Sequence, residues 1–231
     1  MKKTILILSV LMLCATFVIA NYTTVESLGT SGDYKVTFDQ PVKKGWNLLP
    51  ADKGAWSLSS DMPEESFLQN IKAYLIYLPL QNKYVNALSG FSQTDFPYVQ
   101  ANEDYLQTAT GWFYFTGDTT LSYIVEDGGV MPNLHQGWNL VSINPMMTEL
   151  NSQVATTDKF PRGDCIILKA YMWDSVEQMW ESIGDANSIH DSLDEFKDNE
   201  AIGVGLALKV KSTCQLGVSS EGVTPPPALP N

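Results

Sequence analysis

The chain has 231 residues, of which 44% are hydrophobic and only 17% are charged, so it can form a sizeable core and is not an intrinsically disordered sequence. Its 14 basic and 26 acidic residues give a formal net charge of −12, which argues against a nucleic-acid partner. Neither property identifies a ligand or a reaction.

Residues 1–20 have the pattern of a secretory signal peptide. Lys2 and Lys3 precede an uncharged, mostly apolar run from Thr4 to Ala20 that ends in compact residues. We expect export to the medium or the cell surface, with cleavage after Ala20. An uncleaved N-terminal anchor stays open, because the run is just long enough to cross a bilayer. Removal of this segment takes away two lysines and no acid, which changes the net charge from −12 to −14.

The rest of the chain is rich in strand patterns. Short apolar, aromatic or β-branched runs that are typical of strands occupy residues 34–38, 46–49, 73–78, 111–115, 120–125, 138–143, 170–173 and 203–208. Short helices are expected at Pro63–Ile71 and Pro97–Gln107, and Ser188–Phe196 is an amphipathic stretch. These patterns predict a mainly β fold with short helices, that is, a β-rich α+β class.

A tetrapeptide occurs twice, as Gly45-Trp46-Asn47-Leu48 and as Gly137-Trp138-Asn139-Leu140. Such self-similarity indicates an internal repeat. Matching Ala73-Tyr74 to Ala170-Tyr171, and Gly111 to Gly205, extends the alignment with small shifts. We expect two tandem homologous repeats, each a small antiparallel sheet or sandwich. The predicted segments are the signal peptide (1–20), a leader and first repeat (21–128), the second repeat (129–216) and a Pro-rich tail (217–231).

Two cysteines follow the signal peptide, Cys165 and Cys214, and both belong to the second repeat. An even number of cysteines in an exported chain favours a disulfide, which would join two predicted strands. The alternative is a pair of buried free thiols, because unpaired cysteine packs well as a small hydrophobic residue.

Both copies resemble the GWNLISLP-type repeat of bacterial and archaeal extracellular and cell-surface proteins. The resemblance spans residues 40–216 and includes the opening motifs, the central strands at Ala73–Val85 and Ala170–Trp180, and the aromatic strand at Gly111–Tyr114. In the second copy the closing strand has eroded to Gly205–Leu208. The resemblance implies a cell-surface location in a noncatalytic part of a protein. It supplies no functional residues.

The motif tryptophans, Trp46 and Trp138, have two interpretations. The favoured one is that each indole fills the centre of its unit, and the alternative is that each stacks on a sugar. Asn47 and Asn139 are expected to satisfy nearby backbone groups, as asparagine often does near strand ends and turns. Gly45 and Gly137 complete this structural motif.

Other aromatic residues are weak candidates for ligand binding. An exposed cluster of them would indicate a binding surface, whereas packing between sheets or between repeats is the favoured alternative. These candidates are Trp56, Trp112, Tyr114, Trp173 and Trp180.

No motif indicates a metal, a cofactor or a catalytic nucleophile. His135 and His190 are the only histidines and lack the spacing of a zinc site. The acidic stretch 185–200 lacks a calcium-binding loop, and Arg162-Gly163-Asp164 is typical of a turn and a weak integrin signal. No two of the 26 acids stand out as a catalytic pair.

We therefore expect an exported, noncatalytic, acidic module of the cell surface with a structural or adhesive role. Its partner would be a surface protein or a glycan, with no nucleic acid, and with membrane contact only through an uncleaved signal. The first alternative is a carbohydrate-binding module that uses exposed aromatics. The second is a secreted hydrolase with an unidentified carboxylate pair.

Overall fold

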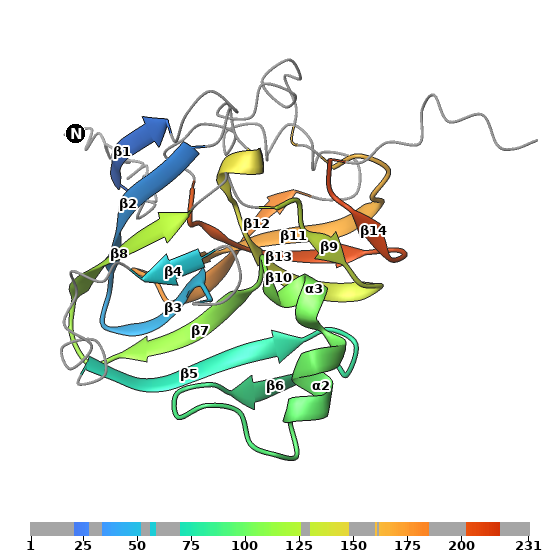
Figure 1. Cartoon of the computed structure of the whole chain (residues 1–231), viewed down its shortest axis with the longest axis horizontal. Coiled ribbons are helices and arrows are strands. Elements are labelled where there is room, and N and C mark those ends of the chain that lie inside the picture. The colour runs from blue at the N-terminus through green and yellow to red at the C-terminus, as the bar shows by residue number, and fades with distance from the viewer. Residues whose placement is uncertain are drawn as a thin grey trace, which may run out of the picture.

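The structure is a computed structural model that describes residues 21–27, 34–51, 56–58, 70–125, 130–147, 160, 162–184 and 202–217. Within them the chain is mainly β, with short helices and small antiparallel sheets, which confirms the predicted fold class (Figure 1). The signal peptide, the amphipathic stretch 188–196 and the tail after Gly217 lie outside the described residues. So does the predicted helix at 63–71, except for Asn70 and for Ile71, which opens a strand.

Two four-stranded antiparallel sheets carry the repeated motif and have the same strand order (Figure 1). The first sheet runs in the order β3 (Gly45–Pro50), β7 (Thr110–Phe115), β5 (Ile71–Leu78), β6 (Lys83–Asn86). The second sheet runs in the order β10 (Gly137–Ser142), β13 (Gly205–Val210), β11 (Ile167–Asp174), β12 (Met179–Gly184). In each sheet the motif strand lies at an edge and a hairpin forms the other end.

The pairing registers put the two sheets in residue-by-residue correspondence. β5 and β11 have a bulge at the same place, after Ile71 and after Ile167 respectively. Each residue of the first hairpin therefore corresponds to the residue 96 positions later in the second hairpin. The last strands correspond at a spacing of 95, because Gly45 pairs with Phe115 and Gly137 with Val210. Common descent of the two halves stays a prediction.

These spacings correct two matches made from the sequence. Tyr74 corresponds to Ala170 rather than to Tyr171, and Gly111 corresponds to Leu206 rather than to Gly205. Because successive side chains of a strand point to opposite faces, an error of one residue reverses the face. Tyr74 is buried and stacks on Phe113, with ring centroids 4.1 Å apart, whereas Tyr171 is half-buried on the opposite face.

Two further sheets flank the motif sheets. The third sheet runs in the order β1 (Asn21–Ser27), β2 (Tyr34–Val42), β8 (Thr119–Val125), β4 (Trp56–Leu58). A two-residue ladder pairs β9 (Asn133–Leu134) with β14 (Cys214–Gln215). β9 precedes β10 and β14 follows β13, just as β2 precedes β3 and β8 follows β7. The second half therefore has a short ladder in the place of the long β2–β8 pair.

A disulfide joins Cys214 of this short ladder to Cys165, with a Cα–Cα distance of 5.5 Å. The predicted bridge is confirmed, and the alternative of two free thiols is wrong. It ties β14 to the segment that leads into β11. The bridge thus reinforces the second half at the two-residue ladder of β9 and β14.

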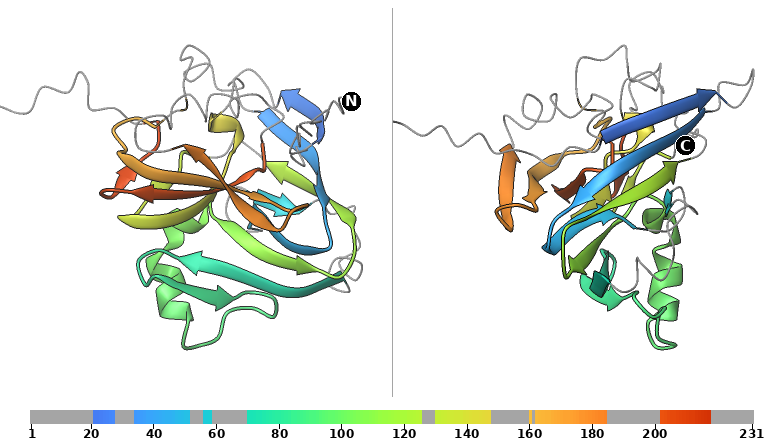
Figure 2. Two further views of the ribbon diagram at one scale, coloured as in Figure 1. Left: turned by 180° about the vertical axis from the view of Figure 1, so that it is seen from behind. Right: turned by 90° about the vertical axis from the view of Figure 1, so that its left-hand side faces the viewer.

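The helix predicted at 97–107 is present as α2 (Phe96–Ala101) and α3 (Glu103–Leu106), with Asn102 between them. α2 lies alongside the β5–β6 hairpin (Figures 1 and 2), and α3 lies next to β9 and β10. A short 3₁₀ helix, η1 (Pro145–Met147), follows β10. All the sheets share one core, since Phe38, Phe113, Leu134 and Leu206 belong to a single buried cluster. The two halves are packed as one body around that core.

Candidate functional site

The repeated Gly-Trp-Asn motif builds the same turn at the start of β3 and of β10. Gly45 and Gly137 have φ angles of +107° and +99°, a conformation that favours glycine. Asn47 Nδ2 donates to the carbonyl oxygens four and two positions earlier, at 2.7 and 3.1 Å, and Oδ1 accepts from the N–H four positions earlier at 3.1 Å. Asn139 makes the same three bonds at 2.8, 3.1 and 2.9 Å. Both asparagines satisfy local backbone groups as expected.

The motif tryptophans occupy a different place from the one expected. Asn47 and Asn139 are buried, so Trp46 and Trp138, one position earlier in each strand, point to the opposite face of their sheets. Both indoles are half-buried. The expectation that they fill the centre of each unit is wrong, because alternation along the strand directs them away from the shared core.

The outward faces of the first and second sheets meet and form an aromatic cleft. Its floor is a small cluster of four buried residues, two from each sheet, and half-buried or exposed rings rise around it. The floor consists of Leu48, Tyr77, Leu140 and Ala207. The surrounding rings belong to Trp46, Trp112 and Tyr84 on the first sheet, and to Trp138, Tyr171, Trp173 and Trp180 on the second.

Some of these rings touch across the cleft. Trp112 of the first sheet meets Trp173 and Trp180 of the second edge to face, with ring centroids 4.8 and 5.4 Å apart. Edge-to-face contacts of this kind stabilise an interface by about 0.5–1.5 kcal/mol each. Trp180 is nevertheless 37% exposed, and Tyr84 is 50% exposed. The rings therefore both join the sheets and remain accessible.

Three of the aromatic candidates from the sequence thus come together in the cleft, namely Trp112, Trp173 and Trp180. Tyr114 lies at one end, where its ring packs 5.2 Å from that of Trp46. The side chain of Trp56 lies outside the described residues. Residues that the sequence did not single out as ligand candidates also line the cleft, above all Tyr77, Asn82, Tyr84 and Tyr171.

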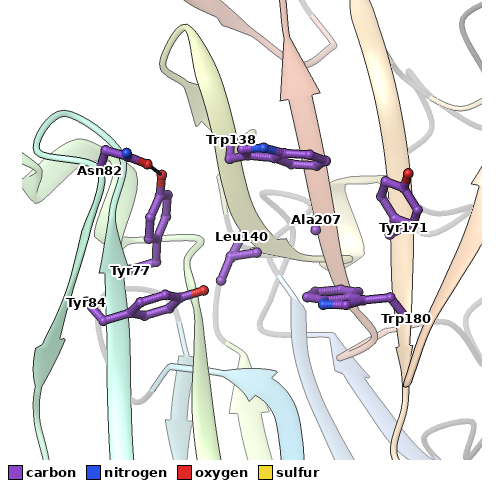
Figure 3. Close-up of a pocket in the computed structure, with 8 residues that line it drawn as sticks. All are labelled: Tyr77, Asn82, Tyr84, Trp138, Leu140, Tyr171, Trp180 and Ala207. Atoms are coloured by element: carbon purple, nitrogen blue, oxygen red, sulfur yellow. Dashed lines mark hydrogen bonds between the residues drawn. The ribbon is translucent and has the colours of Figure 1, made fainter. Parts of the chain in front are cut away.

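One pocket in the cleft, the wide pocket, has a volume of about 480 Å³. Figure 3 shows Trp138 and Trp180 on opposite sides of it, with Tyr77 and Tyr84 on the first sheet facing Tyr171 on the second. Leu140, Ala207 and Asn82 complete the lining. The wide pocket is therefore enclosed mainly by aromatic rings from both sheets.

The wide pocket also has polar groups on its first-sheet side. The Tyr77 hydroxyl donates to Asn82 Oδ1 at 2.7 Å, and Asn82 adopts a positive φ of 49° in the β5–β6 turn. Burial, reinforced by the neighbouring Tyr84, raises the pKa of Tyr77 above its ordinary value of 10.0, so the hydroxyl keeps its proton. Hydroxyl and amide groups of this kind can hydrogen-bond a polar ligand.

The second pocket, the narrow pocket, has a volume of about 340 Å³. It shares Tyr84 and Trp180 with the wide pocket, so the two lie next to each other along the cleft. The rest of its lining comes from Trp46, Leu75, Trp112 and Trp173.

The registers relate the two pockets to each other. Each first-sheet residue of the narrow pocket corresponds to a second-sheet residue of the wide pocket: Trp46 to Trp138, Leu75 to Tyr171, Tyr84 to Trp180 and Trp112 to Ala207. Conversely, Trp173 and Trp180 correspond to Tyr77 and Tyr84. The two pockets thus have corresponding linings, in which the first and second sheets exchange places. The replacement of Trp112 by Ala207 explains why one is larger.

The two halves also differ in how each hairpin turn meets the opposite sheet. Gln178, in the β11–β12 turn, accepts from Trp46 N–H at 2.8 Å and donates to Trp46 O at 2.9 Å. Trp173 Nε1 donates to the same oxygen at 2.9 Å. The corresponding turn residue is Asn82, which is shorter and bonds Tyr77 in its own hairpin. The amide of Gln178 therefore ties the β11–β12 turn to the edge of β3 at Trp46.

The hairpin that carries Tyr77, Asn82 and Tyr84 is held from behind by the helices. The buried Asn102, between α2 and α3, donates to Gln81 Oε1 at 2.7 Å. Lys83 forms a 2.7 Å salt bridge with Asp95 at the start of α2. The hydrogen bond from Lys83, together with one from Ser92, holds the pKa of Asp95 below the usual range. The first-sheet wall of the cleft is thus built before any ligand arrives.

Other candidate chemistry is not gathered at the cleft. Within the described ranges, neither pocket has a carboxylate in its lining, and no group of three or more His, Cys, Asp or Glu side chains could hold a metal. Desolvation, with Asp174 and Glu177 nearby, raises the pKa of Glu181, but this side chain points to the opposite face of β12 from Trp180. His190 and the acidic stretch 185–200 lie outside the described residues.

No protein-family model, curated protein or solved structure matches the chain. Among the residues with described structure, no helix is long and apolar enough to cross a membrane. The resemblance to the GWNLISLP-type repeat therefore stays a prediction from the sequence.

Proposed function

We propose that this protein is an exported, noncatalytic cell-surface module that binds a carbohydrate in the aromatic cleft. The observation that carries the proposal is the convergence of accessible rings from both sheets around two adjoining pockets. The C–H bonds on the face of a sugar ring pack favourably against the electron-rich face of an aromatic ring. Binding of a surface glycan would also serve the adhesive role expected from the sequence.

The polar groups of the cleft fit the same ligand class. Sugars carry hydroxyl groups around the ring edge, and the wide pocket offers tyrosine hydroxyls and the Asn82 amide at its border. The lining has no described charge that would select an ion. A hydrolase would need a carboxylate pair at the cleft, so the proposed role is binding alone.

The test is a glycan-array screen of the exported chain, followed by calorimetric titration of the best ligand. Trp180→Ala should weaken binding by roughly tenfold or more, since Trp180 lines both pockets and stacking on an aromatic ring would be lost. Met179→Ala is the matched control, because its side chain is 54% exposed and points to the opposite face of β12. Thermal unfolding checks that both variants fold. Absence of binding to every glycan, or full binding by Trp180→Ala, would contradict the proposal.

A further inference from the structure

We infer that the wide pocket alone holds the sugar, one pyranose ring at a time, and that Ala207 is the residue that admits this ring. The inference rests on the proposed carbohydrate-binding function and assigns the place and the size of its ligand. It follows from a comparison of the two pockets, because Ala207 lies in the wide pocket where the narrow pocket has Trp112.

In the narrow pocket the rings of the two sheets contact one another. The centroid of the Trp112 ring lies 4.8 Å from that of Trp173 and 5.4 Å from that of Trp180, both on the second sheet. On its own sheet, Trp112 lies 6.2 Å from the ring of Trp46. The narrow pocket is also the more open of the two and would enclose less of a ligand. We therefore assign its rings to the packing between the sheets.

The wide pocket keeps the surroundings of Trp112 without its ring. The three rings that contact Trp112 all have aromatic counterparts, namely Tyr77, Tyr84 and Trp138. The rings of Tyr77 and Tyr84 lie 5.2 Å apart, close to the 5.4 Å between their two counterparts. Of these four positions, only that of Ala207 lacks a ring in the wide pocket. The surroundings of one ring are therefore present, and the ring itself is absent.

The wide pocket is also free of ring contacts between the sheets. Among its described rings, Tyr77 contacts Tyr84 on the first sheet, and Tyr171 contacts Trp138 and Trp180 on the second. Figure 3 shows the Ala207 methyl group in the lining below Trp138 and above Trp180. A ligand ring can therefore enter there without separating the sheets.

The polar groups at this position favour a sugar ring. Figure 3 shows the Tyr84 hydroxyl directed toward the pocket. Within the described part of the chain, neither this hydroxyl nor that of Tyr171 has a hydrogen-bond partner. A pyranose ring offers an apolar C–H face to the aromatic rings and hydroxyl groups at its edge to the two tyrosines.

The first test gives Ala207 the residue type of its counterpart. Ala207→Trp supplies the absent ring, so affinity for the best array ligand should fall by roughly tenfold or more in calorimetric titration. The unfolding temperature should stay at or above that of the parent, because the new ring fills space beside Tyr77 and Tyr84. Ile166→Trp is the matched control, since Ile166 is 49% exposed and lies outside both linings. Undiminished binding by a folded Ala207→Trp variant would overturn the inference.

The second test uses the unaltered chain and varies the length of the ligand. The methyl glycoside of one sugar unit of the best array ligand should bind once per chain, with an affinity within about threefold of that of the whole glycan. A gain of roughly tenfold or more with length would show that a second unit is bound. Such a gain, or a stoichiometry of two ligands per chain, would overturn the inference.

These outcomes are separate from failure of the proposed function. If a glycan binds and either test gives the contrary result, the carbohydrate proposal stands and the single-ring inference is wrong. If no glycan binds to the parent chain, the proposed function fails and the inference falls with it. If Ala207→Trp does not fold, the smaller change Ala207→Leu takes its place, and the titration by length needs no variant.

Discussion

At the scale of single residues, the motif separates into a structural part and a surface part. The glycine allows the positive φ, the buried asparagine closes the turn with three hydrogen bonds, and the tryptophan points into the cleft. The turn needs the glycine and the asparagine in both copies, which explains their repetition. The tryptophan is repeated because each copy contributes one equivalent wall to the cleft.

The asparagines should be essential for stability. Asn47→Ala and Asn139→Ala each remove three hydrogen bonds to partly buried backbone groups, so each should lower the free energy of unfolding by about 1–3 kcal/mol. Urea denaturation measures this change. Lys72→Ala, at an exposed position of β5, is the control and should have little effect. A loss of less than about 0.5 kcal/mol in both asparagine variants would show that the turn does not depend on these bonds.

Sequence reasoning succeeds for the asparagines and fails for the tryptophans, for a physical reason. An asparagine beside a glycine turn has local partners, whereas the face of a strand residue depends on which side of the sheet the core lies. The motif by itself does not define that side. Matching the identical Ala-Tyr pairs gave a register that was wrong by one residue, and that error conceals the correspondence between Leu75 and Tyr171 in the two pockets.

At the scale of elements, the strands themselves were predictable, because aromatic and β-branched runs are short and bounded by turn residues. Their order was not. The last strand of each motif sheet, β7 or β13, inserts between the motif strand and the hairpin, and no local pattern indicates that insertion. The two-residue ladder of β9 and β14 is also too short to leave a strand pattern in the sequence.

The disulfide is expected to stabilise this short ladder. Cys165 and Cys214 are 49 positions apart, and closure of a loop of that length restricts the unfolded chain by an amount equivalent to about 4 kcal/mol. The double variant Cys165→Ser, Cys214→Ser should therefore unfold at a lower temperature than the oxidised parent in calorimetry. The reduced parent is the control and should behave like the double variant. An unchanged unfolding temperature after verified reduction would contradict this role.

At the scale of the whole molecule, each half protects an exposed strand edge of the other. The Tyr105 hydroxyl, from α3, donates to Leu140 O at 2.8 Å and accepts from Leu140 N–H at 2.9 Å at the edge of β10. Gln178 does the same for Trp46 at the edge of β3. A covered edge cannot pair with another chain. These side chains therefore fix the relative position of the two sheets and, with it, the shape of the cleft.

A shorter side chain at the Gln178 position should loosen one end of the cleft. Gln178→Asn introduces the residue type of its counterpart, Asn82, and asparagine tolerates the φ of +55° at least as well as glutamine. The change therefore tests the reach of the amide and not the backbone conformation.

We expect the free energy of unfolding of Gln178→Asn to fall by about 1–2 kcal/mol as the paired bonds to Trp46 are lost. Acrylamide should also quench the tryptophan fluorescence more strongly, because loss of these bonds frees the edge of β3 at Trp46, to which Trp173 also donates. Glu177→Ala, in the same turn and exposed, is the control. Unchanged stability and unchanged quenching in Gln178→Asn would mean that ring packing alone holds the two sheets together.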